Sequence, residues 1–325
     1  MSRAAVCREL GAPEVLRVET VCAMPLAPGK VRVAIRAAGV NFPDILMVAG
    51  EYQFKPELPF VPGMEAAGDI VEVGSDVRGV KAGERVIVKL RHGAFAEEVA
   101  VTPGHLVPLP ANFDYAEGAT FLAAHGTAYH ALVDRAQIRP GEVLLVHGAG
   151  GGTGLAAVEI GKLLGATVIA AASSDKKLAV AKARGADHLV LYRREPFQDA
   201  VKRITEGRGA DVVFDPVGGE ILEASLRCIG WGARVLVVGF TGGIGLARSN
   251  LLLIKGASLL GVRAGEAIRR DPALGAARLK ALVEWAEAGR IRPHVSHRLP
   301  LADVAKAMRL LIDRKAIGRV ALTMG

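Results

Sequence analysis

The sequence predicts an α/β protein in two parts: a β-rich part, followed by a parallel sheet with helices on both faces. The chain has 325 residues, which is long enough for two domains, and its apolar content of 51% supports sizeable cores. Up to about residue 120, short β-rich runs alternate with turns. From about residue 140, apolar strands alternate with amphipathic helices, which is typical of a parallel sheet covered on both sides.

The first part is punctuated like an all-β domain. Runs such as 31–35 and 70–73 are rich in valine and isoleucine, and a Pro- and Gly-rich turn at 59–63 separates runs of this kind. β-branched residues favour strands, and Pro and Gly favour the turns between them.

The second part repeats a strand and then a helix. The expected strands are 143–146, 167–171, 189–191, 211–214 and 235–238, and the helices between them are 155–164, 175–184, 197–204 and 221–228. Helical segments at 273–288 and 301–312 then precede a final strand, Arg319–Thr323.

A glycine-rich segment, "GAGGGTG", follows the first of these strands and precedes the first helix. The spacing of Gly148, Gly151 and Gly154 is a variant of the dinucleotide fingerprint, with Gly152 and Thr153 between them. Helical N–H groups and the positive end of the helix dipole suit a phosphate at this point. The placement within a βαβ unit therefore predicts pyrophosphate binding, rather than only tight packing of strand on helix.

The tip of the next strand bears on the choice of dinucleotide. An acidic side chain there would bind an unphosphorylated ribose, but this tip carries Ser173 and Ser174. Asp175 comes late enough to be a helix N-cap. Lys177 and the two serine hydroxyls are suited to a 2′-phosphate. The sequence therefore favours NADPH as the cofactor.

Charge and composition narrow the partners. The formal charge is +8, but the basic residues are spread along the chain without interleaved aromatics, which does not favour nucleic acid and is compatible with phosphorylated small molecules. The three cysteines form no C-x-x-C pair. No apolar run reaches the ~18 residues of a membrane span, and the first residues lack the apolar core of a signal peptide, so a cytoplasmic protein without membrane partners is expected.

Several motifs together resemble one family. "GVNFPD", "FVPGMEAAG", "TAYHAL", "HGAGGGTGLAAVEIGKLLGA" and the C-terminal "IGRVALT" are similar to the zinc-independent quinone oxidoreductases of the medium-chain dehydrogenase/reductase superfamily, the group that includes zeta-crystallin. The resemblance covers essentially the whole chain. It implies a GroES-like catalytic domain formed by residues 1–121 and 264–325, and a Rossmann domain, a doubly wound parallel sheet, formed by residues 122–263.

The resemblance also draws attention to zinc ligands that this sequence lacks. Zinc alcohol dehydrogenases of this superfamily use cysteine and histidine ligands to polarise an alcohol oxygen. The matching positions here are Asn41, Met64 and Ala123, which do not suit zinc, and the four-cysteine lobe is missing as well. No metal is therefore expected.

The resemblance implies three residues near the reacting groups. Asn41 matches the family asparagine closest to the nicotinamide, with capping of the turn before Pro43 as the alternative. Tyr52 resembles the tyrosine at the substrate cleft, where its phenol would donate a hydrogen bond to the acceptor or simply pack. Thr127 matches the threonine near the carboxamide side of the cofactor, and equally suits the N-cap of a helix over 128–133.

Further cofactor contacts follow from the same resemblance. Tyr192 and Arg319 match positions that approach the adenosine phosphate in the family, and Gly239, Phe240 and Thr241 match the loop that meets the nicotinamide amide. Phe240 could instead belong to the core. Asn250 could reach the cofactor or cap a helix.

Three other polar residues are weaker candidates for a functional role. His125 is a candidate proton donor because histidine is the side chain suited to proton transfer near neutral pH, although no partner carboxylate lies nearby in sequence. Glu65 follows the family pattern, and a structural hydrogen-bonding role is favoured over acid–base work. His147 is expected to pack beneath the glycine loop.

The prediction is an NADPH-dependent reductase of quinones or α,β-unsaturated carbonyls, which accept hydride without a metal. The resemblance implies a homodimer, with 258–262 as the edge strand that pairs across a two-fold axis. One alternative is reduction of enoyl thioesters such as acyl-CoA. An alternative of another class is a crystallin-like structural or RNA-binding protein that retains NADPH.

Overall fold

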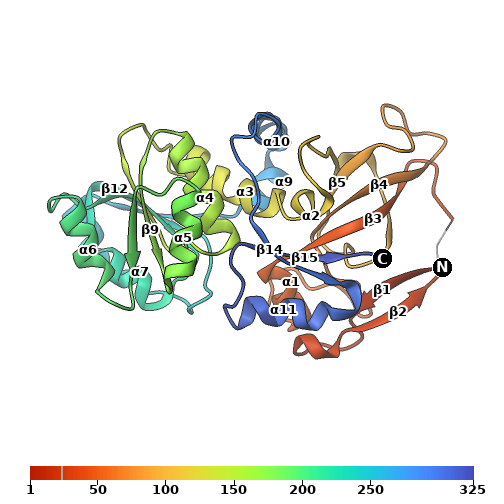
Figure 1. The fold of residues 1–325 in the computed structure, drawn as a ribbon, viewed down its shortest axis with the longest axis horizontal. Coiled ribbons are helices and arrows are strands. Elements are labelled where there is room, and N and C mark those ends of the chain that lie inside the picture. Colours follow the sequence, from red (N-terminus) through yellow and green to blue (C-terminus); the bar gives the residue numbers. More distant parts are fainter. Residues whose placement is uncertain (23–24) are drawn as a thin grey trace. The chain divides into compact units, whose positions relative to one another are not determined.

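A computed structural model describes residues 1–22 and 25–325. Its contacts divide the chain into two compact units. The first unit contains Met1–Ala123 and Pro293–Gly325, and the second unit contains Ala124–Arg292. The mixed α/β fold predicted from the sequence is confirmed, with a β-rich unit and a parallel-sheet unit (Figure 1).

The first unit is built mainly from antiparallel strands. One sheet pairs β1 with β2, and a larger sheet has the order β14-β15-β3-β4-β5-β7, with β6 also paired to β3. The strands are β1 (Ser2–Val6), β2 (Arg17–Val21), β3 (Val31–Val40), β4 (Glu65–Val73), β5 (Arg85–Lys89), β6 (Glu98–Val101), β7 (Leu106–Pro108), β14 (Val295–Pro300) and β15 (Arg319–Thr323). Because β15 pairs with β3, the C-terminal segment completes the sheet that the N-terminal part begins.

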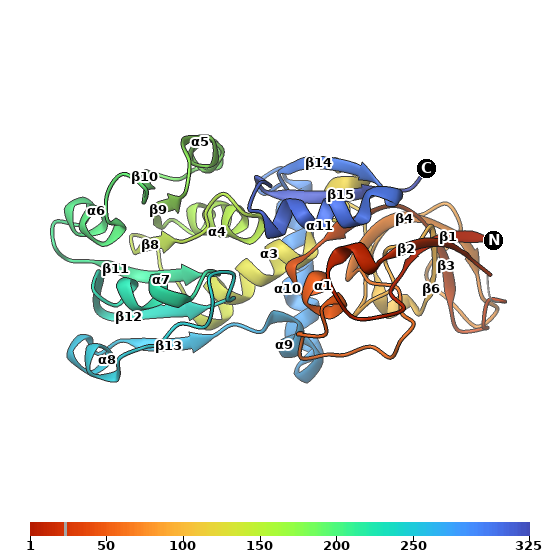
Figure 2. The same cartoon turned by 90° about the horizontal axis from the view of Figure 1, so that it is seen from below.

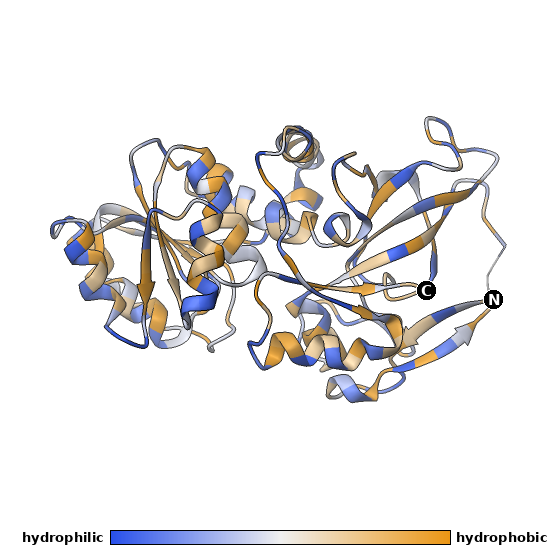
Figure 3. Ribbon diagram, in the orientation of Figure 1, coloured by the Kyte–Doolittle hydropathy of each residue, from blue (hydrophilic) through white to orange (hydrophobic). Residues whose placement is uncertain are grey.

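Short helices accompany this sheet. They are α1 (Phe42–Val48), α2 (Tyr115–Gly118) and α11 (Val304–Ile312), and α3 (Leu122–Tyr129) begins in this unit. Figure 3 shows hydrophobic and hydrophilic bands along α11, and its buried residues Val304, Ala307 and Met308 join the core that includes Val40 and Phe95. This amphipathic pattern is what the sequence at 301–312 predicted.

The second unit contains a six-stranded parallel sheet with the order β10-β9-β8-β11-β12-β13, which Figure 2 shows with β10 and β13 at its two edges. The strands are β8 (Val143–Val146), β9 (Thr167–Ala172), β10 (His188–Leu191), β11 (Ala210–Asp215), β12 (Ile229–Val237) and β13 (Ser258–Gly261). Relative to the chain, this is the order 3-2-1-4-5-6 of a dinucleotide-binding sheet.

Helices cover both faces of this sheet, with α4 and α5 on one side and α6 and α7 on the other (Figure 1). The helices are α4 (Gly152–Leu163), α5 (Asp175–Ala183), α6 (Phe197–Ile204), α7 (Gly219–Ser225), α8 (Ser249–Lys255), α9 (Ala264–Arg270) and α10 (Pro272–Glu287), and a π-helical turn spans His130–Arg135. The central strands are largely buried because both faces of the sheet are covered, and every residue of β8 is buried.

The division of the chain differs from the expected boundary at residue 264. Helices α9 and α10 group with the second unit, and the chain returns to the first unit at Pro293. A buried side chain accounts for this difference. Arg278 on α10 is 1% exposed and donates hydrogen bonds to Asp134 Oδ2 (2.8 Å) and His130 Nδ1 (3.1 Å) in the π-helical turn.

Among the described residues, no helix is both long enough and apolar enough to span a membrane.

Candidate active site and cofactor site

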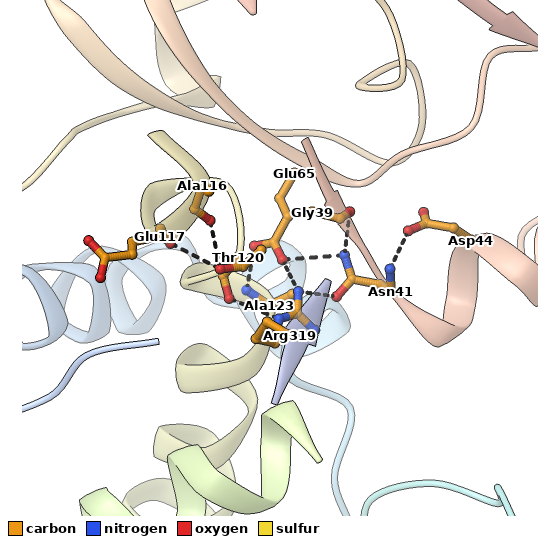
Figure 4. A network of polar contacts seen from close by, with 9 residues as sticks. All are labelled: Gly39, Asn41, Asp44, Glu65, Ala116, Glu117, Thr120, Ala123 and Arg319. Carbon is orange, nitrogen blue, oxygen red and sulfur yellow. Dashed lines mark hydrogen bonds and ion pairs between the residues drawn. The ribbon is translucent and has the colours of Figure 1, made fainter. Parts of the chain in front are cut away.

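A buried polar network lies in the first unit, where β3, β4 and β15 meet (Figure 4). Arg319 on β15 forms an ion pair with Glu65 on β4, and its Nη2 donates to Asn41 Oδ1 (2.8 Å). Its Nε also donates to the carbonyl oxygen of Thr120 (3.1 Å). All three charged or amide side chains are at most 8% exposed, so their mutual hydrogen bonds take the place of water.

Asn41 is held at both ends of its carboxamide. Its Nδ2 donates to Glu65 Oε1 and to the carbonyl oxygen of Gly39, each at 3.3 Å, while its Oδ1 accepts from Arg319. Asn41 is also the residue that precedes α1, so the capping alternative is confirmed. Its backbone N–H donates to Asp44 Oδ2 (2.8 Å), which is the N-cap to N3 pairing that the spacing N-x-x-D allows. This N-x-x-D spacing is the signal that could have identified Asp44 from the sequence.

Asp44 and Glu65 place two carboxyl groups beside one guanidinium. Both are buried, and Asp44 Oδ1 has no hydrogen-bond partner among the described residues. Burial raises the pKa of Asp44 to about 7, although the Asn41 backbone bond opposes the shift. Burial also raises the pKa of Glu65, against the charge of Arg319. Ala123 N donates to Glu65 Oε2 (2.9 Å), so Glu65 has the structural hydrogen-bonding role expected of it.

The three positions that match the zinc ligands of related enzymes do not form a zinc-binding arrangement among the described residues. Asn41 is already bonded through both ends of its side chain, Ala123 has no ligating atom, and Met64 packs against the hydrophobic core. Among the described residues, no group of three or more His, Cys, Asp or Glu side chains is placed to hold a metal.

Tyr52 follows α1 in a loop. It is half-buried, and its ring packs against the same core as Met64 and Phe54. The packing alternative is therefore present in the structure, and donation by the phenol to an acceptor stays a prediction.

The glycine-rich segment of the second unit forms a tight turn between β8 and α4. Gly148 has φ +56°, and a Cβ on Gly154 would lie 2.2 Å from the carbonyl oxygen of Gly148. Helix α4 begins at Gly152 with Gly151 as its N-cap, and no side chain caps it. The first N–H groups of the helix are therefore available to a phosphate, and the absence of side chains leaves room for it. The turn fits a dinucleotide pyrophosphate.

Gly154→Ala is expected to weaken NADPH binding at least tenfold, because the added Cβ cannot fit without opening the turn. Gly104→Ala is the matched control, since nothing lies within 4 Å of a Cβ at that exposed position. Enhancement of NADPH fluorescence on binding measures both variants. Unchanged binding in Gly154→Ala would contradict the assignment of this turn to the cofactor.

The helix that follows β9 is capped by a different residue from the one that the sequence suggested. Helix α5 begins at Asp175 and its N-cap is Ser174, whose Oγ accepts from the backbone N–H of Lys177 (3.4 Å). The alternative that Asp175 is the N-cap is therefore wrong; its carboxylate instead forms an ion pair with Arg194 (3.1 Å). The stem of Lys177 crosses the glycine turn, since a Cβ on Gly150 would lie 2.6 Å from it.

The loops after β11 and β12 pack on each other. Thr241 Oγ1 donates to the carbonyl oxygen of Pro216 (3.2 Å), and a Cβ on Gly239 would lie 3.1 Å from the same oxygen. Asp215, which sequence reasoning missed, ends β11 and accepts from the backbone N–H groups of Val217 (2.8 Å) and Gly218 (3.0 Å). This buried carboxylate fixes the loop that supports residues 239–241.

Two alternatives for this region are wrong. Phe240 is 51% exposed, so it does not belong to the core. Asn250 is the second residue of α8, whose N-cap is Arg248, so it does not cap the helix. Their contacts with the cofactor stay predictions, as does that of Tyr192, which lies exposed immediately after β10.

Arg319 is placed in the first unit, with its guanidinium bonded to Glu65, Asn41 and Thr120. Ser173, Ser174 and Lys177 belong to the second unit. A contact between Arg319 and the adenosine phosphate stays a prediction.

The contacts of three residues in or near α3 and β8 can be compared with the roles expected of them. Thr127 is half-buried inside α3, so the alternative that it caps a helix is wrong. His125 has a partner carboxylate after all, because its Nε2 lies 3.0 Å from Glu159 Oε2. His147 is buried against Phe197, its Nε2 lies 2.8 Å from Ser225 Oγ, and burial lowers its pKa to about 3. His147 is therefore neutral and structural.

The chain is similar to known proteins over almost its whole length. The profile of the alcohol dehydrogenase GroES-like domain covers residues 27–111, and that of the zinc-binding dehydrogenase domain covers residues 152–284. The chain is 39% identical to mouse (Mus musculus) quinone oxidoreductase-like protein 2 over 324 residues, which are 99% of this chain and 92% of that protein. The chain belongs to the quinone oxidoreductase-like family of the medium-chain dehydrogenase/reductase superfamily. It is also 31% identical to human (Homo sapiens) quinone oxidoreductase, over 100% of this chain and 98% of that one.

Solved structures of similar proteins have the same fold as this quinone oxidoreductase-like protein. An NAD-dependent alcohol dehydrogenase has a TM-score of 0.91 at 32% identity, over 99% of this chain and 100% of that chain. A mycobacterial protein in complex with NADPH has a TM-score of 0.90 at 28% identity, over 99% of each chain. The JamJ enoyl reductase has a TM-score of 0.87 at 30% identity, over 100% and 99%. The protein is thus an oxidoreductase of a family that binds a nicotinamide cofactor.

Proposed function

We propose that the protein transfers hydride from NADPH to a quinone or an α,β-unsaturated carbonyl without a metal ion. The observation that carries this proposal concerns the positions that match the zinc ligands of zinc-dependent relatives. Asn41 is bonded to Glu65 and Arg319 through both ends of its carboxamide, Met64 packs against the core, and Ala123 has no ligating atom. Quinones and enones accept hydride through their own electronics, so the protein has to orient the two reactants and exclude water.

The residues of this chain hold and orient the reactants. When bound, the cofactor supplies a hydride from its nicotinamide ring. The backbone of the glycine turn would hold the pyrophosphate, Gly239, Phe240 and Thr241 would meet the carboxamide, and Asn41 would lie against the nicotinamide. Asn41 is suited to a fixed orientation because Glu65 and Arg319 restrain both ends of its carboxamide. The acceptor would gain the hydride on carbon, and the negative charge that then forms on its carbonyl oxygen would be neutralised by a proton from solvent.

NADPH is favoured over NADH by the composition of the β9 tip. The strand tip itself carries Ser173 and Ser174 and no acid to bind a free ribose hydroxyl. The next residue, Asp175, is an acid, but its carboxylate is paired with Arg194. Among the similar structures, one is a complex with NADPH and another is described as NAD-dependent, so the cofactor has to be tested directly.

A rate measurement tests the proposal. The initial rate of NADPH oxidation at 340 nm is measured on enzyme dialysed against a strong chelator, with a simple quinone, with an enone, and with NADH in parallel. A quinone- or enone-dependent rate that survives chelation and favours NADPH supports the proposal. A rate that disappears with chelation and returns with zinc would contradict it.

Reduction of enoyl thioesters is the second candidate, because the JamJ enoyl reductase shares the whole fold. The net charge of +8 would also favour a polyanionic substrate such as an acyl-CoA. A higher kcat/KM for crotonyl-CoA than for small quinones in the same assay would decide for this alternative.

We also propose that the protein is a homodimer joined through β13. This strand is an edge of the six-stranded sheet, and Leu259 on it is 38% exposed. Leu253 and Ile254 on the preceding helix α8 are 81% and 63% exposed. An edge with such neighbours is usually covered by another chain.

Leu259→Asp is expected to convert a dimer into a monomer, because it places like charges at the paired edges. Val71→Asp is the control, since Val71 is an exposed strand residue of the first unit. Size-exclusion chromatography with light scattering at micromolar concentration measures the mass. A monomeric wild-type protein would contradict the proposed dimer.

A further inference from the structure

Two chain segments leave the sheet side by side at the tips of β9 and β10. These strands are parallel, and Leu191 at the end of β10 is paired with Ala172 at the end of β9. Residues 173–177 follow one strand and residues 192–195 follow the other. They are joined by an ion pair between Arg194 Nη2 and Asp175 Oδ2, 3.1 Å apart.

Cationic side chains outnumber acids at these tips. The cations are Lys176, Lys177, Arg193 and Arg194, and the acids are Asp175 and Glu195. Glu195 is bonded on both oxygens by Arg203, at 2.8 and 3.0 Å. Asp175 is therefore the acid that competes with an incoming anion for Arg194.

This cluster adjoins the dinucleotide turn. A Cβ on Gly150 would lie within 2.6–2.8 Å of the Cβ, Cγ and Cδ atoms of Lys177, so the lysine stem lies directly on the turn. In dinucleotide-binding sheets the adenosine ribose extends from the turn over the tip of the second strand, which is β9 here. A pocket of about 340 Å³ also opens beside the ion pair, with Asp175, Leu178, Leu191 and Arg194 among its lining residues.

We propose that Asp175 and Arg194 together set the choice between NADPH and NADH; this rests on the cofactor site of the proposed function. With NADPH, the guanidinium of Arg194 leaves Asp175 and binds the 2′-phosphate. With NADH, the carboxylate of Asp175 accepts a hydrogen bond from the 2′-hydroxyl.

Arg194 can leave Asp175 for the 2′-phosphate at little cost in free energy, because the ion pair is exposed to solvent. Its side chains are 73% and 69% exposed, and an ion pair in water contributes little to stability. A phosphate offers a planar guanidinium two parallel charge-assisted hydrogen bonds, which are stronger. The two residues therefore act in opposite directions on the two cofactors.

Binding of nucleotide fragments tests the pair without the nicotinamide chemistry. Adenosine 2′,5′-bisphosphate and AMP are titrated by calorimetry into the full-length wild type, Arg194→Gln, Asp175→Asn and the control Arg203→Gln, and NADPH and NADH are titrated in parallel. Arg203 has the same kind of exposed acidic partner, Glu195, and serves as the control for a general loss of charge.

Opposite shifts support the proposal. We expect Arg194→Gln to weaken the bisphosphate and NADPH about tenfold while leaving AMP unchanged. Asp175→Asn should tighten the bisphosphate and weaken NADH, and Arg203→Gln should match the wild type.

Two results would overturn it. If Arg194→Gln and Arg203→Gln weaken the bisphosphate equally, or if Asp175→Asn weakens both fragments, the pair does not select the cofactor even though NADPH binding stands. If the wild type binds neither cofactor, the proposed cofactor site fails together with the pair.

Discussion

Replacing Arg319 by leucine is expected to lower the free energy of unfolding by about 3–5 kcal/mol, because it removes the cation from a buried ion pair. Glu65 is 1% exposed and would lie beside the buried Asp44 with no guanidinium nearby, so its charge would be either uncompensated or neutralised by uptake of a proton, and both outcomes cost stability. Asn41 would also lose the donor to its Oδ1, so the orientation of its carboxamide would no longer be fixed. We therefore expect kcat to fall as well as stability.

Urea unfolding followed by circular dichroism measures this loss. The control is Arg309→Leu, which removes an arginine of the same unit from an ion pair with Glu14. That pair is 42% and 55% exposed, so its loss should cost less than about 1 kcal/mol. Equal effects of the two substitutions would show that the buried network does not stabilise the fold.

Asp44→Asn is expected to remove a pH dependence of stability. Burial raises the pKa of Asp44 in the folded protein to about 7, above its ordinary value of 3.8. Because the folded pKa is the higher one, the charged form is disfavoured in the folded state. The resulting penalty is absent below the unfolded pKa, grows as pH rises toward 7, and is constant above it.

From this shift, the wild type should lose about 2–3 kcal/mol of stability between pH 5 and pH 8 through Asp44. The asparagine carries no charge at either pH and should lack this loss, and its carbonyl oxygen still accepts from the Asn41 backbone. Urea unfolding at the two pH values measures the difference, with Asp76→Asn at an exposed site as the control. A wild-type slope that persists in Asp44→Asn would place the titration on another group.

The parallel-sheet unit could be predicted closely from the sequence. The expected bounds of β8 and α6 agree with the structure, because a strand buried on both faces reads as a continuous apolar run and an amphipathic helix has a clear period. The position of the glycine turn followed from the same pattern. The edge strand β13 was also found, one residue shorter than expected.

The unit to which α9 and α10 belong could not be predicted from such patterns. Their sequence is compatible with either unit, and it is the buried contact of Arg278 with Asp134, 144 residues away, that joins α10 to the second unit. The π-helical turn that receives this contact has no local sequence signal either.

The residues of the candidate site were predicted from the sequence, but the contacts between them were not. Asn41 was identified, but its partners Glu65 and Arg319 lie 24 and 278 residues away, so no local pattern connects them. Arg194 was missed for the same reason, since its contact with Asp175 depends on the pairing of β9 with β10. Sequence reasoning finds motifs on one element, whereas these sites are made between elements.

The central claim is metal-free hydride transfer from NADPH to an acceptor carbon. The most direct measurement uses NADPH labelled with deuterium at both C4 positions, an enone acceptor, and enzyme dialysed against a strong chelator. Mass spectrometry of the product should show one deuterium, carried on the carbon that accepted the hydride. A reduced product without deuterium, or labelling that occurs only after zinc is added back, would contradict the claim.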